Sequence, residues 1–303
     1  MKHAISLISL ILALCLGFTA SAQSPSAPVD GDMVALQADK LWKLSYLANA
    51  PIKEVTKIAD DMQYPSISPD GTKVLMFQNG GFQKPHKLLQ WSDENPVAEE
   101  LFSDIEVSGY VTWQTDDDFT MREHSAPFTR AGADRHYSLA KKAPQLKLRR
   151  LHKESRLLAY DADDVIILEN ADNQTLQAIS DVRTDRYFGP VVSPDGRFVA
   201  FTGLSTGVHV FDVAANAVVF IGSHGTAPAF SPDGRFLVYA NTRDNGHEIT
   251  SGELVLVDLD AHAYRYIANP NHEIRLRATL SQGAAFVSYQ TDNNSIFRAK
   301  LAP

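Results

Sequence analysis

Histidine, arginine and aspartate side chains recur in the segments that separate the apolar runs of the chain. The set comprises His124, Arg130, Arg135, His136, Arg183, Asp185, Arg186, Tyr187, His224, Arg243, His247 and His272. Imidazole nitrogens can hold a divalent metal, and guanidinium groups bind carboxylates or phosphates. The spacing does not require a metal site, and no H-E-x-x-H motif is present. Three interpretations therefore stay open: separately hydrogen-bonded loop residues, a protein-recognition surface, and a metal or catalytic site.

Three other motifs could also carry chemistry. Gly203-Leu204-Ser205-Thr206-Gly207 matches the pattern of a serine nucleophile, but it joins two strand-like runs where the nucleophile needs a strand followed by a helix. Asp161-Ala162-Asp163-Asp164 lacks the glycine and the distal glutamate of a calcium loop, and residues 116–118 fall at an expected turn. We expect a hairpin loop and two solvated turns. The sequence thus indicates no catalytic residue, metal ligand or cofactor, and a divalent metal at the histidines is the alternative.

The first 22 residues have the pattern of a signal peptide. Lys2 precedes an apolar run over residues 5–18, and Ala20-Ser21-Ala22 supplies the small residues that a signal peptidase reads. The single cysteine, Cys15, lies within this segment, so the mature chain would have no thiol chemistry. Lipidation of Cys15 is disfavoured because Leu14 stands where a small residue is needed. We expect a periplasmic or secreted protein.

Composition narrows the classes of partner. The 303 residues include 28 basic and 36 acidic side chains, a formal net charge of −8. This balance disfavours nucleic-acid binding, which needs a basic face. Beyond the signal peptide no segment is apolar enough to span a bilayer, so no membrane insertion is expected. Residues 23–40 are predicted to form a linker rich in proline and serine at its start.

A short motif that occurs three times predicts how these residues are positioned. Its copies are Ser68-Pro69-Asp70-Gly71, Ser193-Pro194-Asp195-Gly196 and Ser231-Pro232-Asp233-Gly234. Proline suits the second position of a type I turn, and glycine suits the left-handed residue that would close a three-residue hairpin loop. A further proline (Pro65, Pro190 or Pro228) lies in the strand before each turn, which should therefore be a sheet edge. The run after each turn is continuously apolar, so it should be covered on both faces.

The spacing of the copies predicts six such units. The second and third copies lie 38 residues apart, and the first and second lie 125 apart, which is three steps of about 42. Weaker units are expected at residues 110–121, 148–160 and 274–289. Residues 41–47 and 54–58 resemble an outer pair of strands that precedes any inner pair. We therefore predict an all-β, six-bladed β-propeller over residues 41–303, in which the N-terminal strand completes the last blade.

The Ser-Pro-Asp-Gly hairpins resemble the WD40-like (PD40) repeats of the TolB-type propeller family. The resemblance extends over the predicted propeller and is clear in three units. It implies a TolB-like six-bladed fold more specifically than any function, because such propellers serve as binding modules and as enzymes. The chain departs from TolB itself, which carries a separate α/β domain where this chain has only residues 23–40.

The resemblance also implies where ligands would bind. In such propellers the loops between second and third strands and the loops between blades gather around one mouth of the central channel. The histidines and arginines named above are expected in these loops. Residues 123–134 form the longest loop, with Phe128 as a candidate anchor. The prediction is a monomeric, non-enzymatic scaffold that binds another envelope protein or a small polar ligand through this face. The alternative is a metal-assisted lyase or hydrolase acting on a carbohydrate or a lactone.

Overall fold

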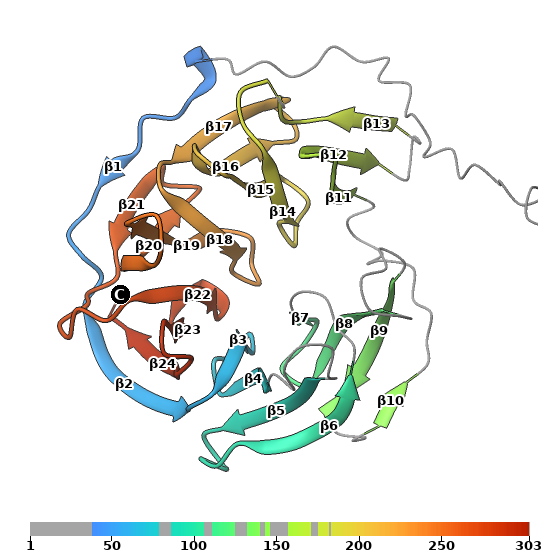
Figure 1. Cartoon of the computed structure of the whole chain (residues 1–303), viewed down its shortest axis with the longest axis vertical. Helices are drawn as coiled ribbons and strands as arrows, with labels where there is room; N and C mark the ends of the chain where they lie inside the picture. Colours follow the sequence, from blue (N-terminus) through green and yellow to red (C-terminus); the bar gives the residue numbers. More distant parts are fainter. Residues whose placement is uncertain are drawn as a thin grey trace, which may run out of the picture. The chain divides into compact units, whose positions relative to one another are not determined.

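The computed structural model describes residues 38–78, 86–105, 111–124, 132–139, 143–145, 157–170, 175–181 and 183–302. The predicted signal peptide, Phe128, Arg130 and most of the weak unit at residues 148–160 lie outside these ranges. The structure is almost all β, with six small sheets arranged in a ring as in a six-bladed β-propeller (Figure 1). The predicted fold is confirmed.

Each sheet forms one blade, numbered here in chain order. Blades 1 to 3 consist of β3 (Met62–Ile67), β4 (Lys73–Gln78), β5 (His86–Ser92) and β6 (Glu99–Ile105); β7 (Thr112–Trp113), β8 (Asp118–His124), β9 (Gly132–Ser138) and β10 (Ala143–Gln145); and, in the described part of blade 3, β11 (Leu157–Ala162), β12 (Val165–Asn170) and β13 (Thr175–Ala178). Blades 4 to 6 consist of β14 (Tyr187–Val192), β15 (Phe198–Gly203), β16 (Gly207–Asp212) and β17 (Ala217–Gly222); β18 (Gly225–Phe230), β19 (Phe236–Asp244), β20 (Ile249–Asp258), β21 (Ala263–Tyr266) and β1 (Ser45–Tyr46); and β22 (Arg275–Leu280), β23 (Phe286–Thr291), β24 (Ile296–Leu301) and β2 (Ile52–Ala59). Two short 3₁₀ helices, η1 (Ala38–Lys40) and η3 (Gln282–Ala284), complete the described elements.

The Ser-Pro-Asp-Gly segments form the predicted turns, with loops one residue longer than expected. Gly71 has a φ of 79°, and its N–H donates to the Ser68 carbonyl at 2.9 Å. Ser68 N–H donates to the Lys73 carbonyl, so four residues lie within the loop. The return bond goes from Lys73 N–H to Ser68 Oγ at 3.0 Å, because the hydroxyl takes the place of the carbonyl as acceptor. The same bonds recur at Ser193 and Ser231.

The proline-bearing strands are the edges of their sheets, as predicted. β3, β14 and β18 each have a neighbour on one side only. Each contains a β-bulge, and the residue before the proline has a positive φ: 53° at Tyr64, 62° at Gly189 and 51° at Ala227. A bulge leaves residues out of the ladder, so the prolines remove no hydrogen bond from the sheet.

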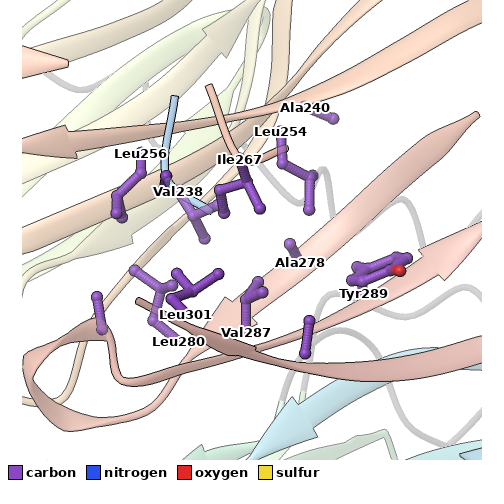
Figure 2. Close-up of a cluster of buried hydrophobic side chains, with 13 residues drawn as sticks. Val238, Ala240, Leu254, Leu256, Ile267, Ala278, Leu280, Val287, Tyr289 and Leu301 are labelled. Carbon is purple, nitrogen blue, oxygen red and sulfur yellow. The ribbon is translucent and has the colours of Figure 1, made fainter. Parts of the chain in front are cut away.

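The cores lie between neighbouring blades. Of the strands after the turns, β15 is buried along its whole length, and β4 and β19 are buried over residues 74–77 and 237–240. These runs are therefore covered on both faces, as predicted. Figure 2 shows the cluster between blades 5 and 6, where Val238 and Leu256 of one blade pack against Leu280 and Val287 of the next. In the described part of the chain, blades 1, 4, 5 and 6 bury apolar side chains on both faces, and this burial stabilises the ring.

The N-terminal strand β2 completes blade 6 by pairing with β24, as predicted. The prediction for residues 41–47 is wrong in part, because they do not form a second strand of that blade. Ser45 and Tyr46 instead form β1, which pairs in parallel with β21 and adds a fifth strand to blade 5. Upstream, Trp42 N–H donates to the Val219 carbonyl of blade 4 at 2.7 Å. Residues 38–59, the N-terminal belt, thus follow the outer edges of blades 4, 5 and 6 (Figure 1).

Candidate functional site

The predicted site residues on blades 3 to 6 lie largely where the sequence placed them. Arg183, Asp185 and Arg186 precede β14, and Tyr187 is its first residue. His224 lies between β17 and β18, His247 between β19 and β20, and His272 between β21 and β22. Arg243 lies in β19, one residue before that strand ends. Because antiparallel strands reverse direction at each step, all these loops belong to the same end of the ring.

The residues of blade 2 are placed differently from the prediction. His124 is the last residue of β8, while Arg135 and His136 lie within β9, opposite Met121 and Thr120. The β8–β9 ladder extends to the pair His124 and Gly132, so both strands are longer than the sequence suggested. Arg135 and His136 are therefore strand residues and do not belong to the loop. Cross-strand pairing, which the local sequence does not encode, sets this length.

Asp185 organises the best-defined group of polar side chains at this end of the ring. Its Oδ1 accepts hydrogen bonds from the Arg186 and Ser205 backbone N–H groups and from Ser205 Oγ at 2.8 to 3.1 Å. Its Oδ2 accepts from the Thr206 N–H at 2.8 Å and from Thr206 Oγ1 at 2.6 Å. Burial alone would raise the pKa of Asp185, but these hydrogen bonds outweigh it and lower the pKa to about 2. The carboxylate fixes the segment before β14 to the β15–β16 hairpin.

His209 extends this network into the core of blade 4. The side chain is buried, stacks on the Phe201 ring and lies 2.7 Å from Thr206 Oγ1 through Nε2. The single Thr206 hydroxyl proton is donated to Asp185, which assigns the hydrogen to His209 Nε2 as a donor. Burial lowers the pKa of His209 to about 4, although the Asp185 charge opposes the shift. The imidazole is therefore neutral at physiological pH.

This arrangement is structural and does not form a Ser-His-Asp triad. In a triad the histidine lies between the hydroxyl and the carboxylate, whereas Asp185 here holds both hydroxyls directly. The G-x-S-x-G segment is the β15–β16 hairpin loop, as predicted. Gly203 is required there, because a Cβ would lie 2.2 Å from Thr206 Oγ1 and 2.7 Å from Asp185 Oδ2.

Two arginines of the predicted site form ion pairs with nearby carboxylates. Arg183 pairs with Asp181 at 2.7 Å, and Arg186 pairs with Asp164 at 2.9 Å. Asp163 and Asp164 have φ values of 51° and 67° and form the tight β11–β12 turn. The acidic segment 161–164 is therefore a turn, as expected. The arginine side chains remain largely exposed but are held in place by these partners.

The three histidines in the described loops of blades 4 to 6 do not form a metal-binding group. His224, His247 and His272 are exposed and lie in three different loops. Within the described ranges, no three histidine, aspartate, glutamate or cysteine side chains are grouped so that they could hold a metal ion. The three histidines thus occupy separate turns, and two of them, His224 and His272, have φ values of 58° and 54°.

A buried arginine between blades 5 and 6, Arg275, is not among the residues that the sequence predicts for a site. Arg275 is 1% exposed, donates from Nη1 to the Ala268 carbonyl at 2.7 Å and lies over the Tyr289 ring at 4.7 Å. Glu273 Oε2 lies 3.7 Å from its Nε, and Asn269 Nδ2 donates to Glu253 and to the Glu273 carbonyl. In the sequence Arg275 looks like an exposed residue of an alternating strand, so only the packing of the blades reveals its burial.

Comparison of the chain with models of protein families and with curated proteins finds no match. Among the residues that the structure describes, no helix is long and apolar enough to cross a bilayer.

Proposed function

We propose that this chain is an exported scaffold of the TolB-type PD40 propeller family that binds another envelope protein through the channel-mouth end of blades 3 to 6. The Ser-Pro-Asp-Gly repeats support the family, and the signal-like first 22 residues support export. We further propose that the scaffold is monomeric and resides in the periplasm or is secreted.

One surface carries this proposal. The blade 4 patch consists of Arg183, Arg186, Phe188 and Leu204, which come from the segment entering blade 4, from its first strand β14 and from its β15–β16 loop. Phe188 is 42% exposed and Leu204 is 64% exposed, and Leu204 N–H donates to the Arg186 carbonyl at 2.9 Å. Apolar side chains beside arginines on a rigid loop are typical anchors of protein interfaces. The Asp185 network supplies the rigidity, so little conformational entropy would be lost on binding.

The experiment is capture of partners from an envelope extract with the tagged protein. We expect one dominant partner, which is lost with Leu204→Ser and retained with Leu176→Ser. Leu176 is a matched control because it is 52% exposed but lies on the outer strand of blade 3. Equal recovery with both variants would contradict binding through the blade 4 patch. N-terminal sequencing of the exported protein tests cleavage after Ala22.

The enzyme alternative has no observation in its favour among the described residues. The metal content of the purified protein tests it directly. A stoichiometric divalent ion that is lost with His224→Gln or His272→Gln would support the enzyme over the scaffold.

A further inference from the structure

Arg277 occupies an unusual place in the inner strand of blade 6. A bulge in each of β3, β14 and β18 contains a residue followed by proline, and the corresponding bulge in β22 contains Leu276 and Arg277. Arg277 thus stands where the other three bulges have a proline. Of the four inner strands whose bulges are described, β3, β14, β18 and β22, only β22 has a cationic residue at this position.

The Arg277 side chain crosses the junction between the last blade and the first. Its guanidinium carbon lies 4.3 Å from the centre of the Tyr64 ring, which belongs to β3 of blade 1. Two residues further along β22, Thr279 Oγ1 accepts a hydrogen bond from Ile67 N–H of the same strand β3. Tyr64 N–H in turn donates to Oε1 of the buried Gln290 in blade 6. Arg277 is therefore held against an aromatic ring at a well-packed junction.

The charge of Arg277 is not neutralised within the described part of the chain. Arg186 and Arg298 each lie about 3 Å from a carboxylate, whereas Arg277 forms neither an ion pair nor a hydrogen bond with any described residue. It is half-buried, and none of its nitrogens is sealed from solvent without a partner. A guanidinium is always charged, and no described residue accepts a hydrogen bond from Arg277. Its N–H donors therefore remain available to an incoming anion.

We propose that Arg277, with Tyr64 beneath it, binds an oxyanion of the carboxylate or phosphate type at the inner edge of the junction between blades 6 and 1. The Tyr64 ring covers one face of the guanidinium and leaves its edge to donate two parallel hydrogen bonds to the anion. This inference rests on the proposed function, since it specifies that the partner presents a negatively charged group to the protein. A bound anion would connect the first blade to the last, so binding should raise the stability of the closed ring.

The test is calorimetric titration of the whole protein, with thermal unfolding as a second readout. Acetate, succinate and inorganic phosphate are the probes, at ionic strength kept constant with sodium chloride so that general screening does not contribute. We expect at least one probe to bind and to raise the unfolding temperature. The responses to the carboxylates and to phosphate, compared at equal concentration, distinguish the two sources of oxyanion.

Arg277→Gln should weaken binding about tenfold or more, as expected when a charge-assisted bidentate pair is lost. Arg265→Gln is the matched control, because Arg265 is also half-buried and also lacks a described carboxylate partner, but lies on the outer strand β21. Should Arg277→Gln fail to fold, Arg277→Lys keeps the charge without the fork, and intermediate affinity is expected. Equal binding by the wild type and a folded Arg277 variant would overturn the inference, as would no response to any probe.

The two proposals fail separately. Oxyanion binding that depends on Arg277, without capture of any envelope partner, would support the inference and leave the proposed function without support. Capture of a partner with equal yield by Arg277→Gln, together with no probe binding, would overturn the inference and leave the proposed function standing.

Discussion

His209 and Asp185 show how single polar residues position the channel-mouth loops. Both belong to one hydrogen-bonded chain that runs from the core of blade 4 through Thr206 to the segment before β14. Every member has a partner, which is the condition under which a buried polar network rigidifies a fold. The loops that carry the blade 4 patch are therefore anchored by this network.

The buried imidazole predicts a defined dependence of stability on pH. The pKa of His209 is about 4 in the folded protein, below the ordinary value of 6.5, so the unfolded state binds more protons between these values. Its contribution is complete above pH 6.5 and is lost as the pH falls toward 4, by about 3 kcal/mol in the free energy of unfolding. Asp185 adds a separate loss below about pH 4, because its own pKa is lowered to about 2.

Urea unfolding between pH 4 and pH 7 measures this effect. His209→Gln keeps a donor toward Thr206 but cannot titrate, so its stability should vary less with pH over this window. His247→Gln, which removes an exposed histidine, should leave the slope unchanged. The same slope in the wild type and in His209→Gln would refute the assignment.

At the scale of the elements, the N-terminal belt contributes side chains to several of the cores between blades. Leu41 packs against the cluster between blades 3 and 4, Trp42 and Leu44 against the next, and Ile52 against the cluster between blades 5 and 6. Ile58 reaches the cluster between blades 6 and 1. The N-terminal belt thus stabilises four interfaces between blades, beyond completing one sheet.

Trp42→Ala tests the belt. The indole stacks on His262 with ring centres 4.0 Å apart and meets Phe198 edge-on at 5.8 Å. Because the side chain is only half-buried, we expect a loss of about 2 kcal/mol in the free energy of unfolding, at the lower end for large-to-small changes. Leu47→Ala, at an exposed position of the same belt, should change stability by less than about 0.5 kcal/mol. Equal urea midpoints for the two variants would contradict a role of the belt in the core.

Two turn glycines allow backbone strain to be separated from a steric clash. Gly71 and Gly246 both have positive φ values, 79° and 86°. A Cβ at Gly246 would meet nothing within 4 Å, whereas a Cβ at Gly71 would lie 2.4 Å from the Phe286 ring of blade 6. Gly246→Ala should therefore cost about 1 kcal/mol from backbone strain alone, and Gly71→Ala about 3 kcal/mol because the ring must also move. Thermal unfolding of the two variants checks the difference, and similar midpoints would count against the close contact.

At the scale of the whole molecule, the described contacts between the first and last blades close the ring. The β2–β24 pairing joins the two ends of the propeller within blade 6, and Gln282 N–H of the blade 6 turn donates to the Pro69 carbonyl of the blade 1 turn at 2.8 Å. Arg298 of β24 donates two hydrogen bonds of 3.0 Å to Asp93 of blade 1 and lies over the Phe286 ring. A turn contact and an ion pair thus reinforce the junction between blades 6 and 1.

Asp93→Asn tests this closure. Arg298 is almost fully buried and its Nε has no partner, so Asp93 supplies the compensating charge. We expect a loss of about 1–2 kcal/mol in the free energy of unfolding, since an amide leaves the buried guanidinium without an anion. Asp260→Asn removes one of the two carboxylate partners of the exposed Arg197 and should cost less than about 0.5 kcal/mol. A larger effect at Asp260 than at Asp93 would show that closure does not depend on this pair.

The sequence by itself determined the blades, because their signals are local. A serine, a proline and a glycine within four residues specify a turn at Ser68, Ser193 and Ser231, and the apolar run that follows specifies a strand buried on both faces. The count of units follows from their spacing, and the lone outer strand at the end predicts the closure by β2. None of these features depends on which distant residue lies opposite.

The tertiary structure alone decided what the polar residues do, because their partners are distant in sequence. Asp185 meets Ser205 and Thr206 only when the segment between two blades folds onto a hairpin, and Arg277 meets Tyr64 only when the ring closes. Strand register placed Arg135 and His136 within β9, and parallel pairing with β21 brought Ser45 and Tyr46 to blade 5. Turn chemistry acts over a few residues and can be read from them, whereas a side chain acquires its environment only when the blades pack.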